Sequence, residues 1–456
     1  MDMQALVQKQ RDYFRTGAAL PLSARREALR RLKVAIKTRE GEVCAALAAD
    51  LNKSPTESYM CEVGMVLSEL TFAERHLASW MRDRPHPTPL AQFPARSCSV
   101  AEPYGVVLIM SPWNYPFLLT LGPLIGAVAA GNCCVVKPSA YSPKVSGVLR
   151  ELLADCFPPE FVSVVEGGRE ANQALLEQKF DYIFFTGSPG VGREVMAKAA
   201  AHLTPVTLEL GGKSPCIVDS TAKLDLAAKR LVFGKLLNCG QTCVAPDYLL
   251  IHRQVKDRFL AYVKRWITVM YGQQPLDNRG YVRMVNEKHF RRVLGLIHRE
   301  KVVFGGGYDP ETLKIQPTIL DNVSLEEPVM QEEIFGPVLP VLTFDRVQEA
   351  LDLVNARPKP LALYLFSEDK GVQDLFLRRA SFGGGCINDT IIHLATSRMP
   401  FGGVGESGMG GYHGKASFDT FTHWKSVVKK STRLDLPFRY APYTPGKDKL
   451  IRLFLK

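Results

Sequence analysis

The chain has 456 residues, enough for two or three domains that bury a sizeable core. Apolar residues make up 46% and charged residues 23%, and this ordinary globular composition excludes a disordered, collagen-like or fibrous protein. The net charge of +11 is concentrated at the end of the chain, where residues 425–456 hold nine Lys or Arg against two Asp. Because only +4 remains for all other residues, the charge does not indicate a nucleic-acid-binding surface, and we expect no nucleic-acid partner.

The ten cysteines include no C-x-x-C pair, so we expect reduced thiols rather than a disulfide scaffold. Residues 1–16 lack the apolar core of a secretory signal, and no apolar stretch reaches the roughly 18 residues that a membrane-spanning helix needs. We therefore expect a soluble, cytoplasmic protein. The tail at 441–456 is basic with an apolar tip, and we expect at most a weak contact between this tail and an anionic membrane surface.

Charged amphipathic helices are predicted from Ala24 to about Trp80, and a proline-rich connector follows them. From Gly105 onward, strand-like and helix-like runs alternate, which predicts right-handed crossovers and a parallel sheet with helices on both faces. The predicted strands are 105–110, 133–136, 161–165, 182–185 and 206–210, and the predicted helices are 116–130, 144–156, 170–178 and 191–202.

A second alternating stretch begins after Gly211-Gly212, with strands at 216–218 and 248–251, helices that reach about 237 and 270, and further alternation to about 387. We predict an α/β protein with two doubly wound parallel-sheet domains and a small oligomerisation arm. The arm would have an unpaired edge that a partner subunit covers. The predicted boundaries are 1–84 and 100–208 for the first domain, 209–397 for the second, 85–99 and 418–440 for the arm, and 441–456 for the basic tail.

Two glycine-rich segments lie where ligands or lids are expected. In residues 186–192, TGSPGVG, the glycines follow a strand and open a helix, a joint that binds anions in parallel sheets. Their spacing is G-x-x-G-x-G and departs from the dinucleotide fingerprint G-x-G-x-x-G, so a plain turn and a phosphate contact remain equally open. Residues 401–408, FGGVGESG, predict a mobile loop, which is either a lid or a wall of a substrate site.

Three polar residues are candidates for chemistry. Cys243 lies in a Gly- and Thr-flanked loop between a helix and a strand, where a thiol can act as a nucleophile, although most cysteines are inert apolar residues. Glu209 ends an apolar strand, and it is either bonded to backbone amides or a lysine, or a general base whose pKa is raised by burial. Asn114 stands between two prolines after a strand, as an amide donor or a turn-former.

The whole set of motifs, in this order, resembles the NAD(P)-dependent aldehyde dehydrogenases from about Ala24 to Ser426. The phrases HLTPVT at 202–207 and GGYHGK at 410–415 are most similar to the class 3 members, which oxidise medium-chain, fatty and aromatic aldehydes and are commonly dimeric. The matching motifs are PWNYP at 112–116, FFTGS at 184–188, LELGGK at 208–213, GQTC at 240–243, EEIFGP at 332–337 and PFGG at 400–403.

The resemblance implies a mechanism. The Cys243 thiolate attacks the aldehyde, Asn114 and the Cys243 backbone N–H stabilise the oxyanion, and hydride transfer leaves a thioester that Glu209-activated water hydrolyses to the acid. A homodimer, NAD or NADP as cofactor, and no metal are expected. The resemblance assigns Tyr115 and Phe401 to the substrate, and it assigns to the cofactor Lys137, Gly187, Ser188, Gly192, Leu210, Glu333 and Phe335.

One position departs from many NAD-preferring relatives, which carry Glu three residues after the lysine, where it binds the ribose hydroxyls. This chain has Ala140 there, so nothing at this position repels a 2′-phosphate, and we hypothesise that NADP is accepted alongside NAD. Two alternatives are a dehydrogenase that transfers the acyl group to CoA or phosphate, and a catalytically silent binding protein on the same fold. The presence of Glu209, Cys243 and Asn114 favours the hydrolytic enzyme over both.

Overall fold

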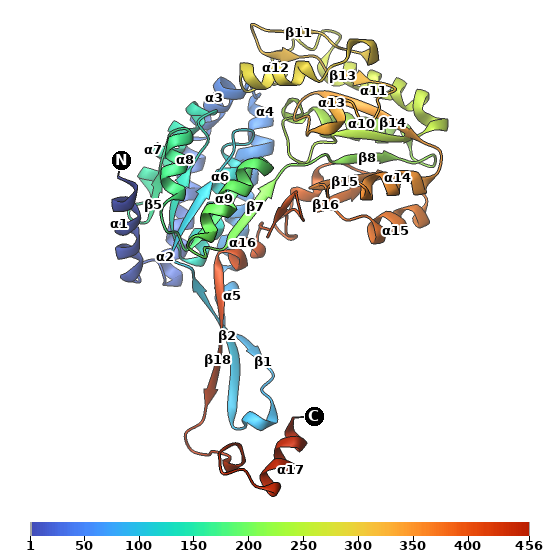
Figure 1. The fold of residues 1–456 in the computed structure, drawn as a ribbon. Helices are drawn as coiled ribbons and strands as arrows, with labels where there is room; N and C mark the ends of the chain where they lie inside the picture. The colour runs from blue at the N-terminus through green and yellow to red at the C-terminus, as the bar shows by residue number, and fades with distance from the viewer. Residues whose placement is uncertain (1, 456) are drawn as a thin grey trace.

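The computed structural model describes residues 2–455. Two open sheets, each covered by helices, form two α/β bodies that lie side by side, and a narrow antiparallel arm projects away from them (Figure 1). The N-terminus lies against the first body, and the C-terminal helix lies at the far end of the arm. This architecture confirms the predicted fold class of two doubly wound sheets.

The first sheet has the strand order β17-β7-β6-β3-β4-β5 and is parallel except for β17 at its edge. Its central strands are continuous apolar runs because helices cover both faces of the sheet. The strands are β3 (Val106–Met110), β4 (Cys133–Lys137), β5 (Val162–Val164), β6 (Tyr182–Gly187), β7 (Val206–Leu210) and β17 (Gly408–Met409), and the connecting helices are α6 (Leu118–Ala130), α7 (Pro143–Cys156), α8 (Arg169–Leu176) and α9 (Pro189–Ala200).

The glycine-rich segment 401–408 is tied to this sheet and is not the free loop that its composition predicts. Gly408 pairs with Glu209, and Met409 pairs with Leu208, in an antiparallel register. Gly408 has φ +141°, and a Cβ at this position would lie 2.1 Å from the carbonyl oxygen of Leu208, so glycine is required for the close approach. A segment some two hundred residues downstream therefore closes the sheet edge beside Glu209.

The second sheet has the order β10-β13-β14-β9-β8-β15-β16, and only β10 at its edge is antiparallel. A two-stranded hairpin, β11 (Tyr308–Asp309) with β12 (Lys314–Ile315), accompanies it. Its strands are β8 (Pro215–Val218), β9 (Tyr248–His252), β10 (Val302–Phe304), β13 (Thr318–Leu320), β14 (Val338–Phe344), β15 (Ala362–Phe366) and β16 (Gly384–Ile387), and its helices are α10 (Leu224–Leu236), α11 (Lys256–Tyr271), α12 (Glu287–Gly295), α13 (Pro328–Gln331), α14 (Val347–Asn355) and α15 (Lys370–Arg379).

The N-terminal helices pack on the first sheet and begin earlier than predicted, at Met3 rather than near Ala24. The first helix was missed because a polar residue faces the sheet: Gln10 is fully buried, and its amide donates to the carbonyl of Cys134 at 2.8 Å. A π-helical turn, η1, interrupts the last of these helices. The elements are α1 (Met3–Arg15), α2 (Leu22–Thr38), α3 (Glu40–Leu51), α4 (Pro55–Ser58), η1 (Tyr59–Val63) and α5 (Gly64–Trp80).

The arm is a three-stranded antiparallel sheet of β1 (Arg84–His86), β2 (Ala95–Pro103) and β18 (Thr422–Lys430) (Figure 1). Strand β2 extends past the predicted boundary at 99, and residue 418 belongs to α16 (Lys415–Thr420), which packs on α6 in the first body. The predicted boundary at 208 falls inside β7. The basic tail forms α17 (Pro445–Phe454), and within residues 2–455 no helix combines the length and apolarity needed to cross a bilayer.

Candidate active site

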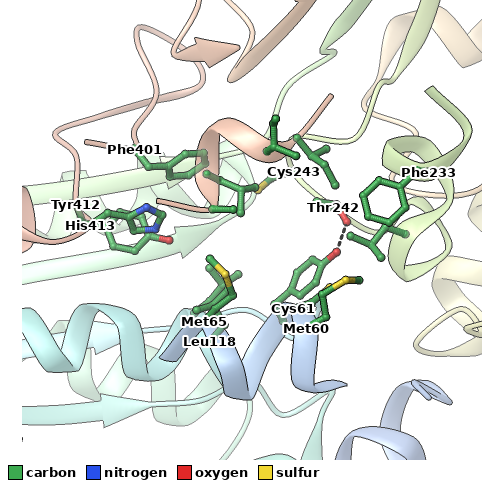
Figure 2. Close-up of a pocket in the computed structure, with 17 residues that line it drawn as sticks. Met60, Cys61, Met65, Leu118, Phe233, Thr242, Cys243, Phe401, Tyr412 and His413 are labelled. Carbon is green, nitrogen blue, oxygen red and sulfur yellow. Dashed lines mark hydrogen bonds between the residues drawn. The ribbon is translucent and has the colours of Figure 1, made fainter. Parts of the chain in front are cut away.

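An apolar cavity of about 210 Å³ leads to Cys243, and elements of both bodies enclose it (Figure 2). The first body contributes Met60 and Met65 from η1 and α5, together with Leu118 from the start of α6. The second body contributes Phe233 from α10, and the segments 391–395 and 401–413 complete the wall. Almost all of the lining is hydrocarbon, ring or thioether, so the cavity suits an apolar ligand.

Cys243 is half-buried in the wall of this cavity, in the loop between η3 (Leu237–Gly240) and β9. The pKa of its thiol is raised to about 12, mainly by burial and also by the negative charges of Glu333 and Glu209, while nearby backbone N–H groups oppose the rise. The thiol is therefore protonated at neutral pH in the free protein. Its position at the cavity wall leaves it accessible to a ligand, in contrast to Cys133 and Cys134, which are buried in β4.

Glu209 lies at the carboxyl end of β7 and is 3% exposed. Neither carboxylate oxygen has a hydrogen-bond partner among residues 2–455, which removes the alternative of a structural glutamate held by amides or a lysine. Desolvation raises the pKa of this carboxyl well above its ordinary value. A buried acid without partners costs stability, and such groups are concentrated at functional sites.

Asn114 follows β3 and is almost completely buried. Its Nδ2 donates to the carbonyl of Gln241 at 3.0 Å, so the side chain reaches across to the cysteine loop and does not cap its own turn. An amide nitrogen carries two protons, and this contact uses one of them. No second acceptor for this nitrogen lies among residues 2–455, so one N–H remains unpaired.

The residues expected to hold a dinucleotide lie at the carboxyl ends of β4, β6 and β7. Ser188 is the N-cap residue of α9 but its side chain makes no capping hydrogen bond, and Thr186 Oγ1 is buried with no partner in the described chain. The free backbone N–H groups of the first turn of α9 therefore fit a pyrophosphate. Gly192 lies in that turn against Leu210, and burial lowers the pKa of Lys137, at the end of β4, to about 8.

Glu333 and Phe335 lie in the loop between α13 and β14, and Glu333 is close enough to the cysteine loop for its charge to raise the pKa of Cys243. Burial raises the pKa of Glu333 to about 8. Its carboxylate packs directly over Gly211, where a Cβ would lie 2.0 Å from Oε2 of the glutamate. Phe335 meets Trp113 edge-to-face, with ring centroids 5.3 Å apart. A polar group and an aromatic ring thus stand at the end of the first sheet, where a nicotinamide riboside would bind.

The structure brings the expected substrate residues, Tyr115 and Phe401, to the same cavity as Cys243. Asn114 and Glu209 stand beside the cysteine loop rather than in the cavity wall. Sequence reasoning missed the wall residues Met60, Met65 and His413. No local signal marks them, because they come from the N-terminal helices and from the segment that follows the glycine-rich loop.

A model of the aldehyde dehydrogenase family matches residues 1–427. The chain belongs to this family and is an oxidoreductase that acts on aldehydes. The 4,4′-diaponeurosporen-aldehyde dehydrogenase of Staphylococcus aureus is 47% identical over 446 residues, with 97% of each chain covered. A solved structure described as the substrate-bound state of Staphylococcus aureus AldH superimposes with a TM-score of 0.98 at 46% identity, with 99% of each chain covered.

Two mammalian relatives confirm the class 3 resemblance. Aldehyde dehydrogenase family 3 member A2 of Rattus norvegicus is 43% identical, with 99% of this chain and 94% of the relative covered. The enzyme of Mus musculus named "Aldehyde dehydrogenase, dimeric NADP-preferring" is 42% identical, with 99% of both chains covered. Since the likeness extends along almost the whole chain, both α/β bodies and the arm belong to one aldehyde dehydrogenase.

Proposed function

We propose that this aldehyde dehydrogenase oxidises medium- to long-chain aliphatic or aromatic aldehydes to carboxylic acids. The observation that carries the proposal is the almost wholly apolar cavity that ends at Cys243. A charged or hydroxylated aldehyde would lose its hydration there without finding partners, whereas each buried CH₂ of an alkyl chain gains about 0.8 kcal/mol. The name of the Staphylococcus aureus relative, which specifies a diaponeurosporen-aldehyde, supports this substrate class.

Cys243 is the proposed nucleophile. Because its pKa is raised to about 12 in the free protein, the thiol must give its proton to solvent water as the carbon–sulfur bond forms, and negative charge develops on the carbonyl oxygen as its π bond breaks. The second N–H of Asn114 and the backbone N–H of Cys243 are the proposed donors to that oxygen. A preorganised donor of this kind is typically worth about 3 to 4 kcal/mol.

Glu209 is the proposed base for the second half of the reaction. A bound nicotinamide would supply the hydride acceptor needed to convert the carbon attached to Cys243 into a thioester. Glu209 takes a proton from water as that water attacks the thioester, the carbon–sulfur bond breaks to release the acid, and Glu209 returns the proton to the sulfur of Cys243. Burial raises the pKa of this carboxyl, so its carboxylate form is a stronger base than that of an ordinary glutamate.

The hydride acceptor is NAD⁺ or NADP⁺. We assign Lys137 to the adenosine ribose and the first turn of α9, with Gly187, Ser188 and Gly192, to the pyrophosphate. Leu210 packs behind that turn, and Glu333 and Phe335 are assigned to the nicotinamide ribose and ring. Ala140 is solvent-exposed and offers no carboxylate against a 2′-phosphate, which supports use of NADP. The name of the mouse relative, which describes it as NADP-preferring, agrees with this assignment.

A homodimer is the proposed assembly. Strand β18 is the edge strand of the arm, and its outer side presents unpaired backbone groups to a second copy of the chain. The mouse relative is described as dimeric. Light scattering of the purified chain should give the mass of two copies, about 101 kDa from a 50.6 kDa chain, and a monomer would remove this proposal.

Substrate profiling tests the proposed function directly. With NAD⁺ in excess, kcat/KM should rise from propanal through decanal and stay high for benzaldehyde, because each added CH₂ finds apolar surface. A charged semialdehyde of matched length is the control and should be a poor substrate. Free acid should remain the product when CoA is added. Preference for the charged semialdehyde, formation of acyl-CoA, or complete lack of turnover would each contradict the proposal.

A further inference from the structure

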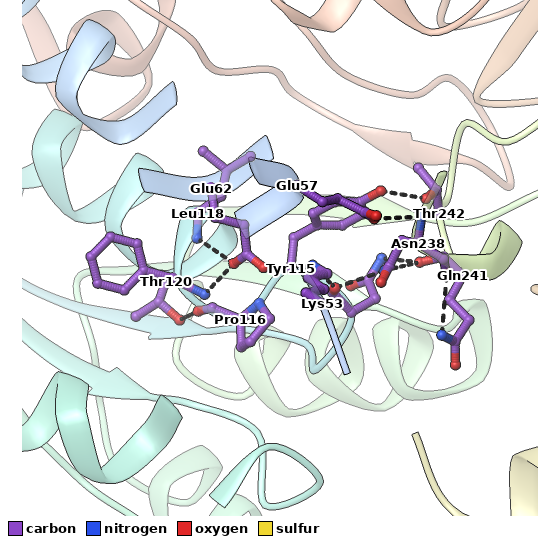
Figure 3. Close-up of polar contacts among 12 residues, drawn as sticks. Lys53, Glu57, Glu62, Tyr115, Pro116, Leu118, Thr120, Asn238, Gln241 and Thr242 are labelled. Carbon is purple, nitrogen blue, oxygen red and sulfur yellow. Dashed lines mark hydrogen bonds and ion pairs between the residues drawn. The ribbon is translucent and has the colours of Figure 1, made fainter. Parts of the chain in front are cut away.

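Lys53 is a fully buried cation next to the candidate oxyanion donor (Figure 3). It lies between α3 and α4, and its Nζ is 2.5 Å from Oε1 of Glu62, 2.9 Å from the backbone oxygen of Asn114 and 4.0 Å from the ring centroid of Tyr115. An ammonium has three N–H bonds, and here a carboxylate, a carbonyl and the face of an aromatic ring meet them. Two of these partners are residues of the proposed site.

Glu62 ties the same loop at a second point. Its Oε2 accepts from the backbone N–H of Phe117 at 2.8 Å and of Leu118 at 3.3 Å, where α6 begins. The Lys53–Glu62 pair therefore holds the loop after β3 both at the carbonyl of Asn114 and at the start of the next helix. A displacement of residues 114–118 would break a hydrogen bond to one of these two buried charges.

Contacts from the second body fix the side chain of Asn114. The Nδ2 of Asn238 donates to the carbonyl of Asn114 at 2.9 Å and to that of Gln241 at 3.1 Å, and Gln241 also accepts from Asn114 Nδ2. The hydroxyl of Tyr115 lies 2.7 Å from that of Thr242, the neighbour of Cys243. The asparagine loop is thus held from both bodies, with Lys53 as the charged anchor on the N-terminal side.

We propose that Lys53 is a positioning residue for aldehyde oxidation, which sets the Asn114 amide and the Tyr115 ring against the cysteine loop. This inference rests on the proposed role of Asn114. A buried ion pair contributes little net stability compared with well-packed apolar residues, so stability alone does not account for a charge at this place. The ammonium supplies three directional contacts at once, and a misplacement of about 1 Å at a reacting centre costs about a hundredfold in rate.

The test compares variants of the full-length enzyme at saturating aldehyde. Lys53→Met should lower kcat by about 10- to 100-fold while the dissociation constant for NAD⁺ stays within twofold of the parent. In an Asn114→Ala background the same change should cost less than about threefold, because residues that act as a unit are not additive. Lys256→Met removes a half-buried lysine 2.8 Å from Asp321 in the second body, and this control should leave kcat unchanged.

The double variant Lys53→Met/Glu62→Gln removes both charges and keeps the test valid if Lys53→Met alone fails to fold. It should fold and remain impaired in kcat. A kcat within twofold of the parent, full additivity with Asn114→Ala, or failure of the double variant to fold would each overturn the proposal, the last because it would assign the pair to stability. If Asn114→Ala itself keeps full activity, the proposed role of Asn114 fails, and that outcome is separate from the others.

Discussion

Two buried carboxylates, Glu62 and Glu209, have opposite surroundings. Glu62, on the N-terminal side, is fully buried and holds a lysine and two backbone N–H groups. Glu209, at the end of β7, is 3% exposed and has no hydrogen-bond partner among residues 2–455. The first arrangement satisfies every charge and fixes a loop, whereas the second leaves an acid free to exchange protons. The contrast separates Glu62, which holds a loop, from Glu209, which we propose as the base.

The same contrast extends to the two approaches to Cys243. The substrate side is an apolar cavity, and the cofactor side carries Glu333, Lys137 and the free N-terminal amides of α9. We propose that a hydrophobic aldehyde occupies the first region and an anionic dinucleotide the second, because the two regions differ in polarity.

Replacement of the nucleophile should have the largest effect. Cys243→Ala is expected to reduce aldehyde oxidation by at least about 10³-fold, because the other thiol of the cavity wall, Cys61, lies in η1 and not in the loop that Asn114 contacts. Binding of NAD⁺, followed by quenching of protein fluorescence, should be retained. Turnover near the parental level would refute the assignment and leave Glu209 without a thioester to act on.

Stability measurements sharpen the comparison of the two carboxylates. Glu62→Gln should lower the free energy of unfolding by about 3 to 5 kcal/mol, because it leaves Lys53 buried without a counter-charge. Glu209→Gln should change it by less than about 1 kcal/mol at pH 5, since the carboxyl makes no contact to lose. Urea unfolding curves measure both, and an equal loss in the two variants would break the distinction.

The pH dependence of stability reports on Glu209 as well. A carboxyl whose pKa is raised in the folded state binds more protons there than in the unfolded chain, so it costs stability as pH rises from the ordinary glutamate range toward its folded pKa. Glu209→Gln should therefore gain up to about 1.4 kcal/mol per pH unit relative to the parent across that window. Parallel stability curves for the two proteins would show that the group titrates normally.

The cofactor prediction has the smallest expected effect. The kcat/KM for NADP⁺ should lie within about a hundredfold of that for NAD⁺, because position 140 carries no carboxylate. Ala140→Glu should lower the value for NADP⁺ by about tenfold through like-charge repulsion and leave the value for NAD⁺ nearly unchanged. A preference of the parent for NAD⁺ above a hundredfold would contradict this assignment.

The sequence predicted what depends on local pattern. Alternating apolar runs identified the five parallel strands of the first sheet to within about two residues at each end but not its edge strand β17, and the motifs around Asn114, Glu209 and Cys243 identified candidates for the chemistry. Helix α1 was not predicted because Gln10, a polar residue, faces the core. The lysine–glutamate pair and the cavity wall were equally hidden, because they depend on contacts between segments that are distant in the sequence, and no spacing rule relates position 53 to position 114.

A rapid-mixing experiment on Glu209→Gln tests most directly whether Glu209 acts only in hydrolysis of the thioester formed on Cys243. Formation of the thioester does not need the base, so the variant mixed with decanal and NAD⁺ should produce about one equivalent of NADH per active site, and steady-state turnover should then fall by roughly 10² to 10⁴-fold. A variant that shows neither the burst nor turnover would place Glu209 in an earlier step, and one that turns over at the parental rate would remove its role altogether.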